Sequence, residues 1–231
     1  MNDPESDGLF DNDWSDGGDL VWNEFDWERY LRAQDDLLHR YLAHYDGLKD
    51  HPDRIDEAAH LMGWDGEDEE SEGVADAAGE AGGLASCPGG EEPEPYTLHK
   101  NPVFIATRAI YLSLKRGWEN LATDAGSVPQ PLALVLQTSL HQGEQHALLG
   151  VQALDLGDYA LAVSLFKRAL EELNRTLALV GGAAGTNRHF AKWRADALPR
   201  FFDLREIWLR VMTECREELE RRVEDTGGED S

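Results

Sequence analysis

Apolar residues in this chain recur at steps of three, four and seven, and this spacing most limits what the chain can fold into. Such steps bring side chains onto one face of an α-helix, whereas a half-buried strand needs steps of two. No stretch alternates in that way. The stretches with helical spacing are residues 22–48, 53–64, 102–122, 131–155, 158–180 and 186–223. The sequence therefore predicts an all-α fold, an up-and-down bundle of five to six helices.

Several helix ends carry recognisable signals. Asn101 is a good N-cap, and Pro102 suits the first helical position after it. The pair Gly181-Gly182 predicts the end of the helix over 158–180. Pro199 removes a backbone donor and clashes with the preceding turn, so the last helix is expected to bend or divide near Leu198.

The acidic residues are concentrated mostly outside these helices. The chain of 231 residues has 46 Asp and Glu against 21 Lys and Arg, a formal net charge of −25. Residues 1–28, 65–94 and 224–231 hold 25 of these acidic residues and no Lys or Arg, so the remainder is electrically balanced. Residues 65–95 also have almost nothing large to bury, which predicts a disordered linker.

These patterns divide the chain into five parts. We expect a disordered acidic tail over residues 1–21 and N-terminal helices over 22–64 that pack on the main domain. The linker over 65–95 follows, then a helical domain over 96–224 and a disordered tail over 225–231.

Charge and hydropathy disfavour several classes of partner. Nucleic acid and anionic membranes need clustered Lys and Arg, which this sequence lacks. The sequence has no run of about 18 apolar residues, so it predicts no membrane span, and its N-terminus is unlike a signal peptide. Cys87 and Cys215 do not form a disulfide framework or a zinc set. A cytoplasmic protein is expected, and the oligomeric state stays open.

Residues 143–175 combine a helix, a tight turn and a second helix with small residues at fixed offsets. The matching positions are Leu149-Gly150, Gly157-Asp158-Tyr159, Ala162, Phe166 and Ala169. This pattern resembles one tetratricopeptide (TPR) repeat. The resemblance implies a close-packed helical hairpin and, in that family, protein binding through a concave surface. The alternative is that any close-packed antiparallel hairpin converges on this pattern.

The chain also departs from that family. Asn174 stands where the repeat has its terminal Pro, Ala153 stands where it has a large aromatic residue, and the early Trp is missing. No second copy follows at the spacing of about 34 residues that a solenoid needs. Residues 101–119 and 202–212 resemble segments of bacterial proteins with no assigned role.

Two glycines lie on the apolar side of the helix over 131–155, at Gly143 and Gly150. Each costs about 0.8–1.0 kcal/mol relative to Ala inside a helix. Two of them on that side predict that the backbone of the helix over 158–180 approaches closely.

One carboxylate, Glu144, falls inside the apolar face of the same helix. A buried carboxylate is costly unless it is paired. His141, three residues earlier, makes Glu144 a candidate half of a metal or acid–base site. The other hypothesis is an interior network with Tyr111, Thr107 or Arg108.

A metal site would need further ligands from the N-terminal helices. Asp36 and His39 lie three apart, and carboxylate–imidazole steps of this kind hold ions in ferritin-like bundles. Two hypotheses therefore remain. The protein has no cofactor, or it binds a transition metal ion through Glu144, His141, His39 and Asp36. His141 precedes Glu144, the reverse of the order in those bundles, and the helix over 53–64 is short.

Motifs of nucleophilic and nucleotide chemistry are missing. There is no Gly-x-Ser-x-Gly elbow, no phosphate loop, and no dinucleotide fingerprint after a strand. The sequence therefore favours a protein that is not an enzyme, but it does not decide between the two classes.

The N-terminal acidic residues alternate with large apolar ones, at Leu9, Phe10, Trp14 and Trp22. Segments of this composition fold on a partner's basic groove. The alternative is that the segment docks on its own domain. The sequence thus predicts a non-catalytic protein-interaction or scaffold protein whose protein partner it does not identify.

Overall fold

The computed structural model describes residues 23–64, 98–124, 126–183 and 187–227. These residues form six α-helices and one short 3-10 helix with no strand among them, which confirms the predicted all-α class. The elements are α1 (Glu24–Gly47), α2 (Arg54–Leu61), η1 (Leu98–Lys100), α3 (Pro102–Ala122), α4 (Gln130–Asp155), α5 (Tyr159–Gly182) and α6 (Arg188–Gly227). The chain divides into two units, Met1–Ala33 and Gln34–Ser231, with the boundary inside α1.

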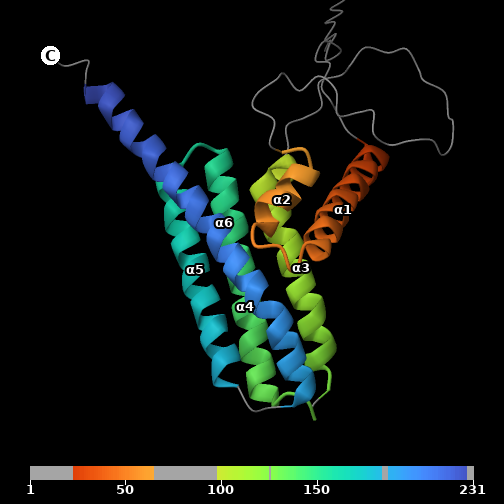
Figure 1. Cartoon of the computed structure of the whole chain (residues 1–231). Helices are drawn as coiled ribbons and strands as arrows, with labels where there is room; N and C mark the ends of the chain where they lie inside the picture. The colour runs from red at the N-terminus through yellow and green to blue at the C-terminus, as the bar shows by residue number, and fades with distance from the viewer. Residues whose placement is uncertain (1–22, 65–97, 125, 184–186, 228–231) are drawn as a thin grey trace, which may run out of the picture. The chain divides into compact units, whose positions relative to one another are not determined.

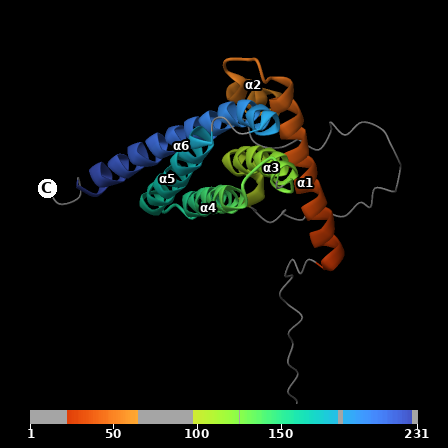
Figure 2. The same ribbon diagram turned by 90° about the horizontal axis from the view of Figure 1, so that it is seen from below.

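Within the second unit, α3, α4, α5 and α6 form a closed ring of antiparallel neighbours. The pair α4 and α5 shares the most extensive interface, and α5 with α6, α3 with α4, and α3 with α6 complete the ring. Figure 1 shows these four helices running in alternating directions, and Figure 2 shows α6 beside α3. This is the arrangement of an up-and-down four-helix bundle.

Local signals place the helix starts as the sequence predicts. The Asn101 side chain accepts hydrogen bonds from the backbone N–H groups of Val103 at 2.9 Å and Phe104 at 3.3 Å, which caps α3. The Asp158 carboxylate does the same for Leu161 at 3.0 Å and caps α5. Gly157, with φ of +75°, makes the turn between α4 and α5, because this backbone conformation favours glycine.

A column of aromatic side chains fills the bundle interior. The rings of Tyr111 and Trp208 stack with centroids 6.1 Å apart, and Phe166 lies 6.4 Å from Trp208. The Trp208 indole N–H donates to Thr107 at 3.2 Å, so its polar atom is satisfied inside the core. Trp118 is fully buried near one end of the same interior. Large aromatic residues from α3, α5 and α6 therefore define the core.

Glycines on α4 admit large side chains from two neighbouring helices. A Cβ atom at Gly150 would lie 3.2 Å from the Phe166 ring of α5, and one at Gly143 would lie 2.7 Å from the Tyr111 hydroxyl of α3. The prediction of close approach by the backbone of one helix is therefore corrected. The close atoms belong to aromatic side chains, and one of them comes from α3.

Replacing Gly143 by Ala is expected to destabilise the protein by about 1–2 kcal/mol, because overpacking against the Tyr111 hydroxyl exceeds the gain in helix propensity. The matched control is Gly181→Ala, also in a helix, where nothing lies within 4 Å of the added Cβ. It is expected to be neutral or to stabilise by up to about 1 kcal/mol. Urea unfolding of both variants measures the difference, and equal effects at the two sites would contradict this account.

The α6 helix is continuous through Pro199, so the helix does not divide there, and the bend expected near Leu198 stays a prediction. Pro199 has no N–H to donate to the carbonyl of Ala195. The Arg200 guanidinium donates to the neighbouring carbonyl, that of Asp196, at 2.8 Å.

The α5 helix ends at Gly182, as the pair Gly181-Gly182 predicts. The α6 helix ends at Gly227, four residues beyond the predicted helix end at 223. The predicted tail over 1–21 and linker over 65–95 lie outside the described residues. Within the described part of the chain, no helix is long and apolar enough to cross a bilayer.

Candidate functional site

Glu144 of α4 is buried in the bundle and paired with a lysine that the sequence analysis did not select. Its residue is 5 % exposed, and Oε2 lies 2.5 Å from Lys115 Nζ of α3. Lys115 follows Tyr111 by four residues on α3, so it shares a face with a core residue and its amine reaches the α4 carboxylate. Burial of Glu144 therefore comes with a counter-charge, as a buried carboxylate requires.

Tyr111 lies close to Glu144 of this pair and to a second carboxylate, Glu172 of α5. Burial raises the pKa of the Tyr111 hydroxyl, and the nearby Glu144 and Glu172 carboxylates raise it further, so this phenol stays neutral. Glu172 accepts a hydrogen bond from Ser139 at 3.0 Å, and Ser139 also contacts the Thr176 hydroxyl at 2.8 Å. These side chains link α3, α4 and α5 as a structural polar network.

The three residues predicted as network partners of Glu144 lie in different surroundings. Tyr111 is its neighbour, Thr107 accepts from Trp208, and Arg108 is exposed. The interior-network hypothesis therefore identified the right helix and one of its residues, and Lys115 is the ion-pair partner that it omitted.

A pocket of about 300 Å³ opens beside Glu144 between η1, α3 and α4. It brings together Glu144 and His141, the pair that the sequence singled out. Its other lining residues are Leu98, Arg108, Gln145, Leu148, Leu149 and Gln152. The wall is therefore mixed, with aliphatic side chains from η1 and α4 and a cation from α3.

The four residues of the predicted metal site do not assemble. No three His, Cys, Asp or Glu side chains gather to hold a metal ion among the described residues. Asp36 and His39 are exposed on α1, and His141 is exposed on α4. Glu144 is paired with Lys115. The described residues therefore offer no ligand set that fits a transition metal at this place.

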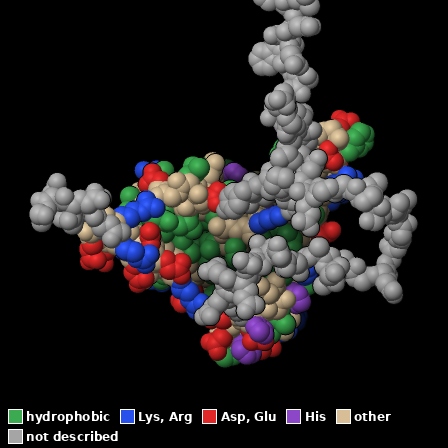
Figure 3. All heavy atoms as spheres, turned by 90° about the horizontal axis from the view of Figure 1, so that it is seen from above, with side chains coloured by type: hydrophobic (Ala, Val, Ile, Leu, Met, Phe, Trp, Pro, Cys, Tyr) green, Lys and Arg blue, Asp and Glu red, His purple; other side chains and the backbone are tan. Residues whose placement is uncertain are grey.

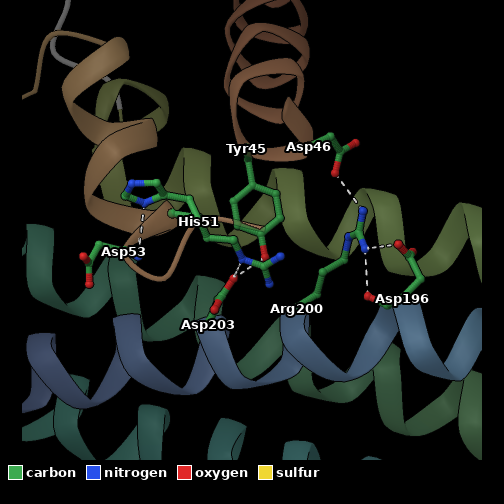
Figure 4. A network of polar contacts seen from close by, with 8 residues as sticks. Tyr45, Asp46, His51, Asp53, Asp196, Arg200 and Asp203 are labelled. Atoms are coloured by element: carbon green, nitrogen blue, oxygen red, sulfur yellow. Dashed lines mark hydrogen bonds and ion pairs between the residues drawn. The ribbon is translucent and has the colours of Figure 1, made fainter. Parts of the chain in front are cut away.

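A second polar site joins α1 and α2 to α6. The Tyr45 hydroxyl donates to the Asp203 carboxylate, and Arg54 Nε pairs with the same oxygen. The Arg54 guanidinium also lies 4.5 Å from the centre of the Tyr45 ring. Figure 4 shows Tyr45 of α1 pointing at Asp203 of α6. Burial and the Asp203 carboxylate raise the pKa of Tyr45, which keeps the hydroxyl a hydrogen-bond donor.

Further ion pairs flank this junction. Arg200 of α6 lies between Asp46 of α1, at 2.7 Å, and Asp196, at 2.6 Å (Figure 4). Tyr41 Oη, Arg54 Nη2 and Arg200 Nε are buried without a hydrogen-bond partner among the described residues. Unpaired buried polar atoms cost free energy. The junction is therefore held by ion pairs, and three of its buried polar atoms have no hydrogen-bond partner among the described residues.

No protein-family model, curated protein or solved structure matches this chain. The resemblance of residues 143–175 to a tetratricopeptide repeat therefore stays a prediction. The hairpin itself is close-packed, with Ala162, Phe166 and Ala169 fully buried.

The first unit exposes large apolar side chains on the start of α1. Phe25 is 72 % exposed, and Trp27 and Leu31, one turn apart, are each 48 % exposed. Glu24 and Asp26 make the first turn acidic. The predicted partner-binding residues Leu9, Phe10, Trp14 and Trp22 lie outside the described residues. The described start of α1 therefore adds apolar residues that the sequence analysis had not selected for binding.

Proposed function

We propose that this chain is a non-catalytic protein-interaction protein whose N-terminal unit binds a partner. The observation that carries the proposal is the exposure of Phe25, Trp27 and Leu31 on a helix whose first turn is acidic. Exposed aromatic residues are expensive to leave in water and are the commonest energetic centres of protein interfaces.

The partner that fits is a protein groove with an apolar floor and a basic rim. An amphipathic helix binds such grooves through side chains one turn apart, as Trp27 and Leu31 are. The ten acidic residues of 1–28, with no Lys or Arg among them, would speed encounter with a basic surface. A nucleic acid does not fit this unit, because its phosphates would meet acidic residues.

The proposal is tested with the full chain, immobilised through its C-terminus and exposed to lysate of the organism that makes it. Enriched proteins are then purified and titrated against the full chain. Trp27→Ala combined with Leu31→Ala is expected to weaken the interaction at least tenfold, about 1.4 kcal/mol, because such anchors dominate binding. Deletion of residues 1–21 is expected to abolish capture without changing the helix content.

The matched control removes two equally exposed leucines elsewhere. Leu134 of α4 is 70 % exposed and Leu156, the residue directly after α4, is 77 % exposed, so Leu134→Ala with Leu156→Ala removes comparable apolar surface. We expect this pair to bind as the unmodified chain does. Equal loss in both double variants, or no protein enriched by the unmodified chain, would refute the proposed function.

A further inference from the structure

We propose that the outward face of α6 pairs two copies of this chain as a parallel dimer with two-fold symmetry. The centre of this face is formed by Leu198, Phe202 and Leu209, which together are called the α6 stripe below. The proposal goes beyond the proposed function, because it assigns a different surface, on the unit Gln34–Ser231, and a different partner, a second copy.

The α6 stripe exposes large apolar side chains close together. Phe202 is 53 % exposed, Leu209 is 38 % exposed, and Leu198 is half-buried. They follow one another at steps of four and seven residues, so they share one face of the helix. Leu134 and Leu156 are also exposed, but they lie at opposite ends of α4. Single exposed leucines are ordinary, whereas an aromatic and an aliphatic residue on one face indicate an interface.

The described helices leave this face of α6 open. Asp203 and Arg210 directly follow Phe202 and Leu209, so they point about 100° away from the α6 stripe. These two charged residues pair with Arg54 and Asp56 of α2. Figure 1 shows α6 in front of α4 and α5, and none of the described helices lies in front of it in that view. The contacts of α6 with α2 therefore use a different side of the helix.

The two flanks of the α6 stripe carry opposite charges. Arg205 and Arg216, 11 residues or about three turns apart, lie on one flank. Glu206 and Glu217, with the same spacing, lie on the other. Arg205, Arg216 and Glu217 have no ion-pair partner among the described residues, and Glu206 pairs with the half-exposed Arg210. Figure 3 shows side chains of both signs next to one another on the C-terminal end of α6, at the left of the view.

This pattern of charge selects a second copy in the parallel direction. In a parallel two-fold pair the basic flank of each helix faces the acidic flank of the other, as e and g positions do in parallel coiled coils. Arg205 then meets Glu206 of the second copy, and Arg216 meets its Glu217. In an antiparallel pair the same flanks would meet, so arginines would face arginines. Like charges across an interface repel, which disfavours the antiparallel pair.

The same geometry limits the assembly to two chains. A two-fold interface uses one patch on both copies, so pairing covers both α6 stripes and leaves none to recruit a third chain. The apolar centre consists of three side chains per copy, which makes the interface a small one. A reversible dimer whose population rises with protein concentration is therefore expected.

Sedimentation equilibrium of the full chain at several concentrations tests the role of the α6 stripe. The average mass is expected to rise from that of one chain towards that of two. Phe202→Ala combined with Leu209→Ala is expected to raise the dissociation constant at least about tenfold, because these side chains form the apolar centre. The matched control is Leu134→Ala with Leu156→Ala, which removes more exposed leucines elsewhere and should leave the constant unchanged.

Charge reversal tests the direction of pairing. Arg205→Glu alone and Glu206→Arg alone should each raise the dissociation constant at least about fivefold, because each brings like charges together twice in a two-fold pair. An equal mixture of these two variants should recover the dimer, since every contact between positions 205 and 206 then joins opposite charges. The control is Arg116→Glu, an exposed arginine of α3, which should dimerise as the unmodified chain does.

Circular dichroism checks that all variants keep the helix content of the unmodified chain. A chain that stays monomeric at every concentration would overturn the proposal, as would equal weakening by the Leu134 and Leu156 control. A stronger dimer with Arg205→Glu would indicate antiparallel pairing and would also overturn it. Failure of the mixture to recover the dimer would show that positions 205 and 206 do not face each other.

Discussion

Replacing Asp203 by Ala is expected to release α1 and α2 from α6 and to cost about 3–5 kcal/mol at that junction. Asp203 accepts from Tyr45 and is paired with Arg54, whose side chain is only 6 % exposed. Without Asp203 a buried guanidinium loses its counter-charge. Undocking of α2 returns Arg54 to water and limits the cost, so the effect is expected to be local before it is global.

Hydrogen exchange followed by mass spectrometry measures this effect. Faster exchange is expected in residues 38–61, with little change in the core of α3, α4 and α5. The control is Asp56→Ala, which breaks the exposed pair with Arg210 between α2 and α6 and should cost less than about 1 kcal/mol. Equal exchange in the two variants would show that Asp203 does not hold the junction.

Replacing Lys115 by Ala is expected to lower the free energy of unfolding of the whole bundle by about 3 kcal/mol, because it leaves the buried Glu144 carboxylate unpaired. The pair lies between α3 and α4, two members of the closed ring, so the loss is expected to act on the stability of the whole bundle. Urea unfolding monitored by circular dichroism and by tryptophan fluorescence measures the loss.

The control for this prediction removes both charges together. Glu144→Gln keeps the side-chain length and Lys115→Met shortens it by one atom. The double variant should recover most of the stability, because neither buried charge is then left alone. If the double variant is as unstable as Lys115→Ala, the cost comes from lost packing and the electrostatic account is wrong.

Most of the fold was predictable because the spacing of apolar residues along each helix is a local pattern that the sequence shows directly. Asn101 and Asp158 are local caps whose partners lie two or three residues away. Continuity of α6 through Pro199 was not predictable, because the proline signal alone does not distinguish a bent helix from a divided one. Closure of the ring between α3 and α6 depends on packing between distant segments and leaves no local pattern.

The sites were predictable only in part. Glu144 stood out because it is a charge inside an apolar arc. Lys115 did not, because lysine usually lies in solvent, although its step of four from Tyr111 was a usable signal. The junction of Tyr45, Arg54 and Asp203 joins residues about 150 positions apart, so the sequence contains no spacing from which to infer it.

The position of Asp203 on α6 also fixes an order of events during synthesis. Tyr45 precedes its acceptor by 158 residues. At roughly 5–20 residues per second, the ribosome makes Asp203 about 8–30 s after Tyr45. Throughout that interval the Tyr45 hydroxyl and Arg54 lack their acceptor on α6, and a nascent-chain chaperone or a neighbouring polypeptide can contact them. The packing of α1 and α2 on α6 can therefore be completed only after α6, the last helix, has been synthesised.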